Sequence, residues 1–182
     1  MTPGDAVRKV KMKTILTLIG IVASLAAASS AQAESSSSIE GVWRVTEESY
    51  EGATVSNNSH PQPGLLILTK GYFSFVRVTV SKPRPLFKTM IPTPEEKLTA
   101  FDEFTASSGT YELVGTTLTI RPIVAKHPNF MVGGWEKYEI RVEEGTLWLM
   151  AKSTDIHMRV GEQIEPMAGG AVLSRRKLVR LE

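Results

Sequence analysis

Short turns between β-forming runs are the feature that most constrains this chain. Lys70-Gly71, Gly115-Thr116 and the turn around Glu143-Glu144-Gly145 each separate two runs rich in β-branched and aromatic residues. Links this short predict hairpins of antiparallel strands. A chain built mainly from such hairpins folds as an up-and-down barrel or as a sandwich.

Eight strands are expected from these runs. They span residues 42–50, 65–69, 72–80, 110–114, 117–124, 135–142, 146–152 and 171–181. Eight strands close into a barrel whose interior can hold one small ligand. We therefore predict an all-β fold, an antiparallel up-and-down barrel of about eight strands. Pro122 lies inside one run and predicts a bulge near the rim, because proline cannot donate to a sheet ladder.

One helix signal interrupts the strands. Thr93-Pro94-Glu95-Glu96 combines an N-cap threonine, a proline at the first helical position and a glutamate that completes a capping box. Leu98, Phe101 and Phe104 follow at helical spacing and predict an apolar stripe that docks on the sheet. We expect a helix over about 94–106. The segments 51–64, 81–91, 127–134 and 153–170 lack an apolar period, and we expect them to be loops.

The first 33 residues resemble a secretory signal peptide in their three-part pattern. A basic region (8–13) precedes an apolar run (14–28), which is too short for a typical membrane span, and the small-residue site Ala31-Gln32-Ala33 follows. We expect cleavage after Ala33, a serine-rich linker over 34–39 and a barrel domain over 40–182. The true start is either Met1 or Met12. The expected location is therefore periplasmic or secreted, with no membrane anchor after cleavage.

Composition and charge narrow the classes of binding partner and the sources of stability. Beyond Ala33 the chain carries 17 basic and 18 acidic residues, so its net charge gives no electrostatic reason to expect nucleic acid or an anionic membrane as a partner. The chain has no cysteine, so its stability must come from the core and the sheet rather than from disulfides.

Several weak motifs occur in a characteristic order. The chain has Gly41-Val42-Trp43-Arg44 at the first strand, then the helix signal, Gly109-Thr110-Tyr111, Pro128-Asn129-Phe130…Gly133 and Gly145-Thr146-Leu147-Trp148-Leu149. In this order they resemble the bacterial and fungal lipocalin-like domain family, a calycin-type β-barrel. The resemblance implies a barrel with a candidate ligand cavity. It also implies a basic residue of the last strand over Trp43, for which Arg175 or Arg176 is the candidate. The chain departs from the family pattern at Thr117 and Thr119, where many members carry histidine.

Aromatic and arginine residues on different strands are the candidate ligand contacts. The set is Phe73, Phe75, Arg77, Tyr111, Arg121, Trp135, Tyr138 and Trp148. Inward aromatics with one or two positive groups describe a cavity for an apolar ligand with an anionic or carbonyl head. The alternative is that the aromatics only fill the core, and that the arginines face solvent or pair with glutamates across strands.

No catalytic or metal-binding motif is present. His60, His127 and His157 do not fall at metal-ligand spacing, so we expect no metal and no cofactor. If Glu47 shares the Trp43 face, it could enter the lumen as an acid of raised pKa, although a solvated strand-end charge is the simpler interpretation. Three functions stay open: carriage or binding of a small hydrophobic ligand, cyclase- or isomerase-type catalysis in the same cavity by Tyr111, Tyr138, Arg77 and Glu47, or a cavity-less interaction protein of the envelope.

Overall fold

A computed structural model describes residues 39–168 and 170–182. The expected signal peptide, and all of the expected linker except Ile39, lie outside these residues. Ile39 itself is fully buried, and its carbonyl accepts a hydrogen bond from Trp43 Nε1 at 2.8 Å.

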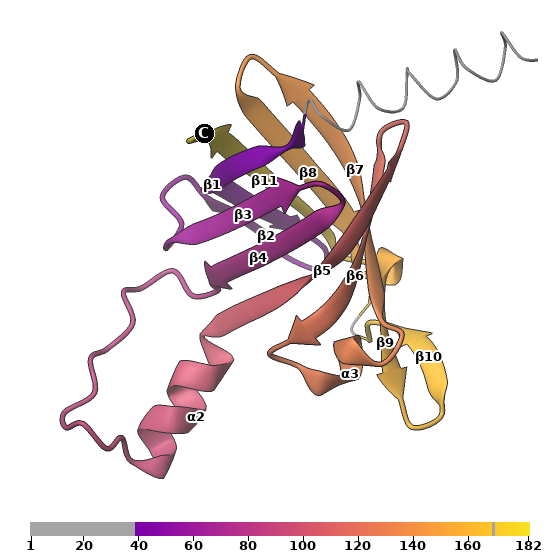
Figure 1. Cartoon of the computed structure of the whole chain (residues 1–182). Coiled ribbons are helices and arrows are strands. Elements are labelled where there is room, and N and C mark those ends of the chain that lie inside the picture. Colours follow the sequence, from indigo (N-terminus) through magenta and orange to yellow (C-terminus); the bar gives the residue numbers. More distant parts are fainter. Residues whose placement is uncertain (1–38, 169) are drawn as a thin grey trace, which may run out of the picture. The chain divides into compact units, whose positions relative to one another are not determined.

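Eight antiparallel strands form a closed barrel, which confirms the predicted fold class (Figure 1). Each strand pairs with its neighbour in the order β1, β3, β4, β5, β6, β7, β8 and β11, and β11 pairs back onto β1. The barrel strands are β1 (Gly41–Glu51), β3 (Gly64–Thr69), β4 (Tyr72–Val78), β5 (Phe104–Val114), β6 (Thr117–Ala125), β7 (Trp135–Glu143), β8 (Thr146–Lys152) and β11 (Leu173–Arg180). They correspond one to one with the eight predicted runs.

The predicted hairpin turns are present because their residues tolerate left-handed backbone angles. Lys70 and Gly71 have φ values of 47° and 81°, and Glu144 and Gly145 have values of 43° and 77°. Two consecutive positive φ angles are typical of the type I′ turn, whose twist matches that of the flanking strands.

Three short strands and a short helix occupy segments that the sequence predicted to be loops. β2 (Val55–Asn58) pairs with the end of β1, and β9 (Ile156–Val160) forms a hairpin with β10 (Gln163–Pro166). The helix is α3 (Pro128–Met131), and a 3₁₀ turn, Ser153–Asp155, precedes β9. β2 and β10 are almost entirely exposed. Backbone pairing alone defines such strands, so no apolar period marks them in the sequence.

The helix α2 (Pro94–Asp102) begins as predicted but ends four residues earlier than expected. Its capping box is complete, because Thr93 Oγ1 accepts from the Glu96 amide at 3.2 Å and Glu96 Oε2 accepts from the Thr93 amide at 2.8 Å. The predicted apolar stripe does not dock, since α2 contains no buried residue and Phe104 belongs to β5. Phe104 pairs with Val78 of β4, so it is the first residue of β5 rather than part of the helix.

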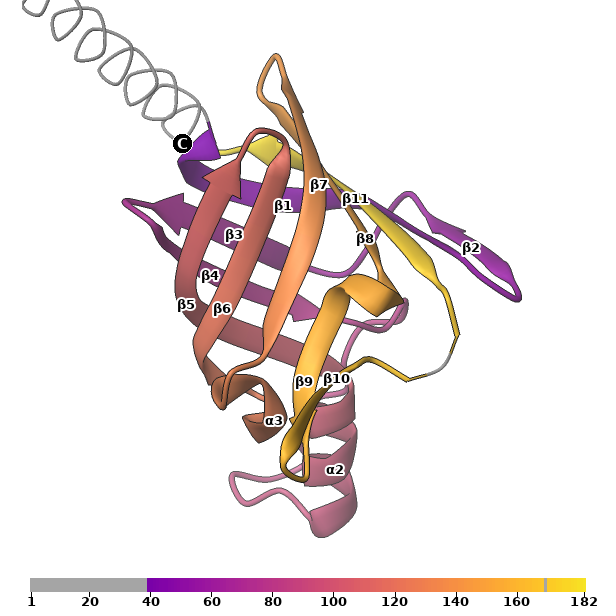
Figure 2. The same ribbon diagram turned by 90° about the vertical axis from the view of Figure 1, so that its right-hand side faces the viewer.

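The two ends of the barrel differ. The β5–β6 and β7–β8 turns lie at one end, and α2, α3 and the β9–β10 hairpin lie at the other (Figure 2). We call the first the closed end and the second the open end. Apolar side chains fill the barrel toward the closed end, among them Trp43, Leu68, Leu118, Leu147 and Leu178, each no more than 1% exposed.

Arg180 covers Trp43, in place of the predicted Arg175 or Arg176. Its guanidinium carbon lies 4.2 Å from the centre of the Trp43 ring, and Arg180 is the direct partner of Trp43 in the β1–β11 register. Alternation along β11 excludes Arg175, which bonds Glu51 at the surface. Arg176 lies on the same face as Arg180, but it is four residues away along β11 and pairs with Glu48 rather than with Trp43.

The predicted bulge at Pro122 is confirmed. The β5–β6 register shifts between Ser108 and Gly109, so that Gly109 pairs with Pro122 while Ser108 pairs with Val124. The backbones approach so closely there that a side chain at Gly109 would collide with the Arg121 carbonyl, which explains the glycine.

Candidate functional site

A bulge in β1 turns Glu48 into the barrel. The β1–β11 register shifts between Val45 and Glu47, which moves the inward positions from Trp43 and Val45 to Glu48. Glu47 is exposed and accepts a hydrogen bond from Lys177 Nζ at 2.8 Å. The bulge thus corrects the hypothesis that Glu47 enters the lumen, because strict alternation from Trp43 fails at this point.

Two arginines meet Glu48 inside the barrel. Glu48 Oε1 accepts from Arg77 Nη1 at 2.9 Å and from Arg176 Nε at 3.1 Å. The Tyr50 hydroxyl accepts from the same two guanidinium groups, at 3.3 and 3.4 Å. Glu48 and Arg176 are only 8% and 7% exposed. The arrangement places two fixed positive groups side by side on one carboxylate.

Glu136 and Tyr138 form the facing half of the group. Both lie on the inward face of β7, and the Tyr138 hydroxyl donates a hydrogen bond to Glu136 Oε2. Burial raises the pKa of Glu136 above its usual value, and the Tyr138 hydrogen bond and the charges of Arg176 and Arg77 oppose this only in part. Burial and the nearby Glu136 raise the pKa of Tyr138, so its hydroxyl stays a donor. We call Glu48, Tyr50, Arg77, Glu136, Tyr138 and Arg176 the inner polar cluster.

A cavity of about 250 Å³ opens onto this cluster at the open end of the barrel. Arg77, Glu136, Tyr138 and Arg176 line it together with Lys126 and His127. Its apolar lining comes from strands, from α3 and from the segment after β10: Phe75, Phe104, Phe130, Ile156 and Met167. Charged groups and apolar surface therefore share one small chamber, an arrangement typical of binding sites.

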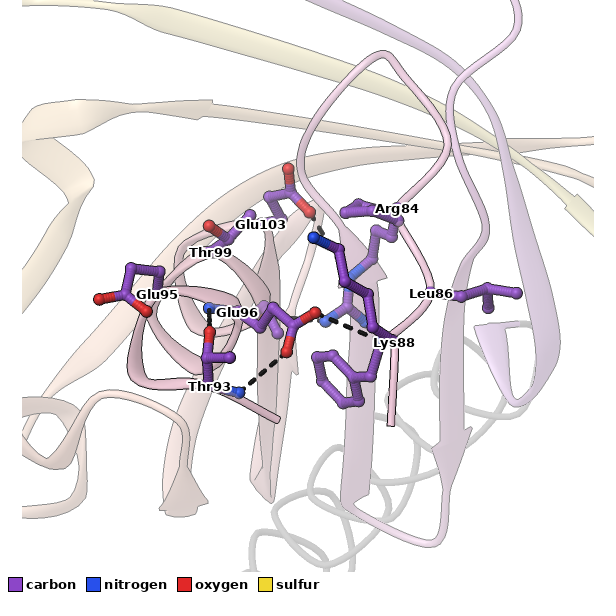
Figure 3. A pocket seen from close by; sticks show the side chains of 11 residues that line it. Arg84, Leu86, Lys88, Thr93, Glu95, Glu96, Thr99 and Glu103 are labelled. Atoms are coloured by element: carbon purple, nitrogen blue, oxygen red, sulfur yellow. Dashed lines mark hydrogen bonds and ion pairs between the residues drawn. The ribbon is translucent and has the colours of Figure 1, made fainter. Parts of the chain in front are cut away.

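A second pocket, of about 560 Å³, lies outside the barrel between α2 and the preceding loop (Figure 3). Arg84, Phe87, Glu96 and Thr99 are among its lining residues. Its walls belong to a helix without buried residues and to an exposed loop. The inner cavity is the stronger candidate site, because barrel strands fix its polar groups.

Three of the eight predicted contact residues line the inner cavity: Phe75, Arg77 and Tyr138. Phe73 shares their inward direction but is packed in the core, 3% exposed. Tyr111 also packs against the core, and its buried hydroxyl has no hydrogen-bond partner. Burial raises the pKa of Tyr111, but it does not line the cavity.

The other three predicted residues lie on the outer face. Arg121 is exposed. Trp135 stacks on His157 with ring centres 3.8 Å apart, and Trp148 lies beside Arg141 and Lys177, each 5.3 Å from its ring. These residues do not line the inner cavity.

Sequence reasoning missed the acidic part of the site and Arg176 as a cavity residue. A signal for Glu136 and Arg176 was present, since each lies two residues from an inward residue of its strand, Tyr138 and Leu178. Glu48 carried no such signal, because the bulge that turns it inward depends on the pairing with β11.

Among residues 39–168 and 170–182, no group of three or more histidine, aspartate or glutamate side chains is placed to hold a metal ion. Within the same residues, no helix has the length and apolar character needed to cross a bilayer.

The closed eight-stranded barrel is compatible with a calycin-like fold. Comparison of the chain with protein-family models, with curated proteins and with solved structures finds no match.

Proposed function

We propose that this chain is an exported, lipocalin-like protein that binds a small, mainly apolar molecule with an anionic or carbonyl head. The apolar body of the ligand would lie among Phe75, Phe104 and Ile156, with its head at the inner polar cluster. The convergence of Arg77 and Arg176 on one small cavity is the observation that carries this proposal. Export rests on the signal-peptide pattern of residues 1–33.

The electrostatics favour a negative or carbonyl head over a positive one. Each guanidinium group has five donors, and the bonds to Glu48 and Tyr50 engage one nitrogen of Arg77 and two of Arg176. Further N–H groups are therefore available to donate hydrogen bonds to a ligand oxygen. Burial raises the pKa of Glu136 and so favours its neutral form, and when Glu136 is neutral the charges of Arg77, Arg176 and Glu48 leave the cluster with a net positive charge.

The stability of the fold does not by itself explain why charged residues of the inner polar cluster are buried in the barrel. Replacing a buried ion pair by apolar residues of similar volume is often neutral or stabilising. The closed half of the same barrel is packed in that apolar way. Charged groups in the open half, beside a cavity, fit a binding role better than a purely structural one.

The volume of the cavity also limits the size of the ligand. Its volume of about 250 Å³ is below the range of about 300–1,000 Å³ that is usual for drug-sized ligands. We therefore expect a compact molecule, or a chain of which only the head and first carbons enter. The presence of a cavity argues against the cavity-less interaction protein.

Calorimetric titration with head groups varied on one tail tests the proposal. We expect octanoate and phenylacetate to bind and octyltrimethylammonium not to bind. Arg77→Met keeps the length of the side chain but removes its donors, and we expect it to weaken carboxylate binding roughly tenfold or more, as for loss of one charge-assisted hydrogen bond. Arg141→Met is the matched control, because Arg141 bonds Glu143 on the outer face.

Circular dichroism first shows whether each variant is folded, and Arg77→Lys provides a milder change if Arg77→Met is not. Native mass spectrometry of protein purified from its own host reports both a co-purified ligand and the N-terminal residue. The binding proposal is wrong if no probe binds and no molecule co-purifies. The proposal of export is wrong if residues 1–33 are still attached to the purified protein.

A second function, proton transfer, is favoured by one specific observation. Tyr138 and Arg77, two of the four residues suspected of catalysis, converge on one cavity, and they do so beside the carboxylate of Glu136, whose pKa is raised. A buried carboxylate near an apolar surface is a suitable general base, and the guanidinium groups can stabilise a developing anion. Tyr111 and Glu47 lie elsewhere and have no part in this arrangement.

The base-catalysed opening of 5-nitrobenzisoxazole tests this function with a visible product. Glu136 would remove the proton on the ring carbon; the electron pair of that C–H bond forms the nitrile as the N–O bond breaks, and the oxygen leaves as phenolate on the same molecule, a cyanonitrophenolate. We expect the rate to rise with pH as Glu136 ionises and to fall about a hundredfold in Glu136→Gln, a usual contribution of one general base. Equal rates in wild type and Glu136→Gln exclude this catalysis and leave the binding proposal untouched.

A further inference from the structure

The loop between β4 and α2 exposes large apolar side chains next to the open end of the barrel. Leu86, Met90 and Ile91 are 93%, 99% and 80% exposed. Isolated apolar residues are common on protein surfaces, but a group so fully exposed within six residues is a typical sign of an interaction surface. We call residues 81–92 the apolar loop.

Hydrogen bonds hold the apolar loop against α2. Arg84 Nη2 donates to the Ala100 carbonyl at 2.9 Å, and the Lys88 amide donates to Glu96 Oε1 at 3.3 Å. Figure 3 shows Leu86 pointing away from α2, with Glu95 on the opposite side of the pocket. The apolar side chain is therefore presented outward, away from that acidic group of the helix.

All charged residues of the apolar loop are basic. Lys82, Arg84 and Lys88 lie within residues 81–92, and the loop contains no acidic residue. The near-neutral charge of the chain beyond Ala33 conceals this, because acidic residues elsewhere in the chain balance the basic residues of the loop. Exposed apolar side chains flanked by basic ones are the combination that peripheral proteins use on anionic bilayers.

We propose that the apolar loop docks the open end of the barrel on an anionic lipid surface. Leu86, Met90 and Ile91 would enter the boundary between head groups and acyl chains, and Lys82 and Lys88 would contact the lipid phosphates. The apolar loop begins beside the cavity, since Thr79, two residues before the loop, is one of the residues that line the cavity. Docking therefore brings the cavity mouth close to the bilayer. The proposal does not depend on ligand binding, because an empty barrel can dock equally well.

Co-sedimentation with lipid vesicles tests this proposal. The probes are vesicles of phosphatidylcholine alone and of equimolar phosphatidylcholine and phosphatidylglycerol. All variants are purified from the full-length gene in one form, with the N-terminus checked by mass spectrometry, so any contribution of residues 1–38 is common to all of them. We expect wild type to bind the anionic vesicles more tightly, and added salt to weaken that preference.

Two variants separate the apolar and the electrostatic contributions. Met90→Asp/Ile91→Asp is expected to lower partitioning into neutral vesicles by at least roughly tenfold, because two apolar insertions are lost, and partitioning into anionic vesicles by more, because two negative charges are added. Lys82→Ser/Lys88→Ser is expected to weaken binding to anionic vesicles by roughly fivefold for each lysine, with little effect on neutral ones. Val114→Asp is the matched control, an exposed apolar residue at the closed end.

Two results would overturn the proposal. One is equal vesicle binding by wild type and Met90→Asp/Ile91→Asp. The other is a concentration-dependent dimer, seen by size exclusion with light scattering, that the same variant abolishes while wild type shows no affinity for vesicles. In that second case a copy of the chain covers the apolar loop, and lipid does not.

Discussion

At the residue scale, Glu136 is the side chain whose charge state matters most. Its pKa in the folded protein is raised above 4.5, mainly by burial. The folded state therefore holds this proton more tightly than the unfolded state does. By linkage, the contribution of Glu136 to stability is fully present below about pH 4.5 and is lost as the pH rises through the folded pKa.

We expect Glu136→Gln to reveal this titration, because glutamine cannot ionise. The free energy of unfolding of wild type minus that of the variant should fall as the pH rises from about 4 to about 8. Urea denaturation at several pH values measures the difference. Glu139→Gln is the control: hydrogen bonds from Thr117 and Thr116 lower the pKa of Glu139, so for this variant the same difference in free energy of unfolding should rise with pH. A difference for Glu136→Gln that stays constant or rises with pH contradicts the expectation.

At the scale of the element, α2 is held by its capping box and by a few surface contacts, among them the hydrogen bonds from Arg84 and Lys88, rather than by packing of buried side chains. No residue of α2 is buried, and its main side-chain contact with the barrel region is Phe101, whose ring lies 4.1 Å from Lys126 Nζ and 5.6 Å from the His127 ring. A nine-residue helix is marginal in water without packing. The capping box of Thr93 and Glu96 is therefore a large part of its stability.

Thr93→Ala should loosen α2 without unfolding the barrel. Loss of an N-cap threonine costs about 1 kcal/mol, and here only the local helix depends on it. We expect faster hydrogen exchange of the amides of α2, measured by mass spectrometry, with a melting temperature close to that of wild type. Thr99→Ala in the same helix should not accelerate exchange, because alanine is the better helix former. A large drop in melting temperature would show instead that α2 supports the barrel.

At the scale of the whole domain, closure of the barrel divides the interior into two parts. Toward the closed end, Trp43 and Leu178 belong to a packed apolar core, and Arg180 covers the tryptophan ring. Toward the open end, the same strands present the inner polar cluster and the cavity. The strand register around the barrel places Arg77 of β4 and Arg176 of β11 on the carboxylate of Glu48.

Most of the fold could be predicted, because its information is local. Turn residues such as Lys70-Gly71 and alternation such as Phe73, Phe75 and Arg77 specify strands and faces from neighbouring positions. The short strands β2, β9 and β10 escaped prediction because backbone pairing with a partner, rather than an apolar period, defines them.

The candidate site was predictable only in part. Arg77 was found as a charged residue within a strand and Tyr138 as one of the strand aromatics, whereas the choice of Trp135 and Trp148 failed to account for which face is inward. Glu48 could not be found, because a bulge reverses the alternation that starts at Trp43. Residue type suggests what a side chain can do, and only strand register decides where it lies.

The sequence by itself determined the eight strands, their hairpin order and the start of α2, because each depends on residues a few positions apart. The tertiary structure alone decided three further features: the cover of Trp43 by Arg180, the meeting of Glu48 with Arg77 and Arg176, and the cavity beside them. Arg77 and the cavity depend in part on the pairing of β4 and β7 with their neighbours around the barrel. The first feature and the contact of Glu48 with Arg176 depend on pairing between β1 and β11, whose residues are more than a hundred positions apart. Pairing across such a distance forms only when the barrel closes.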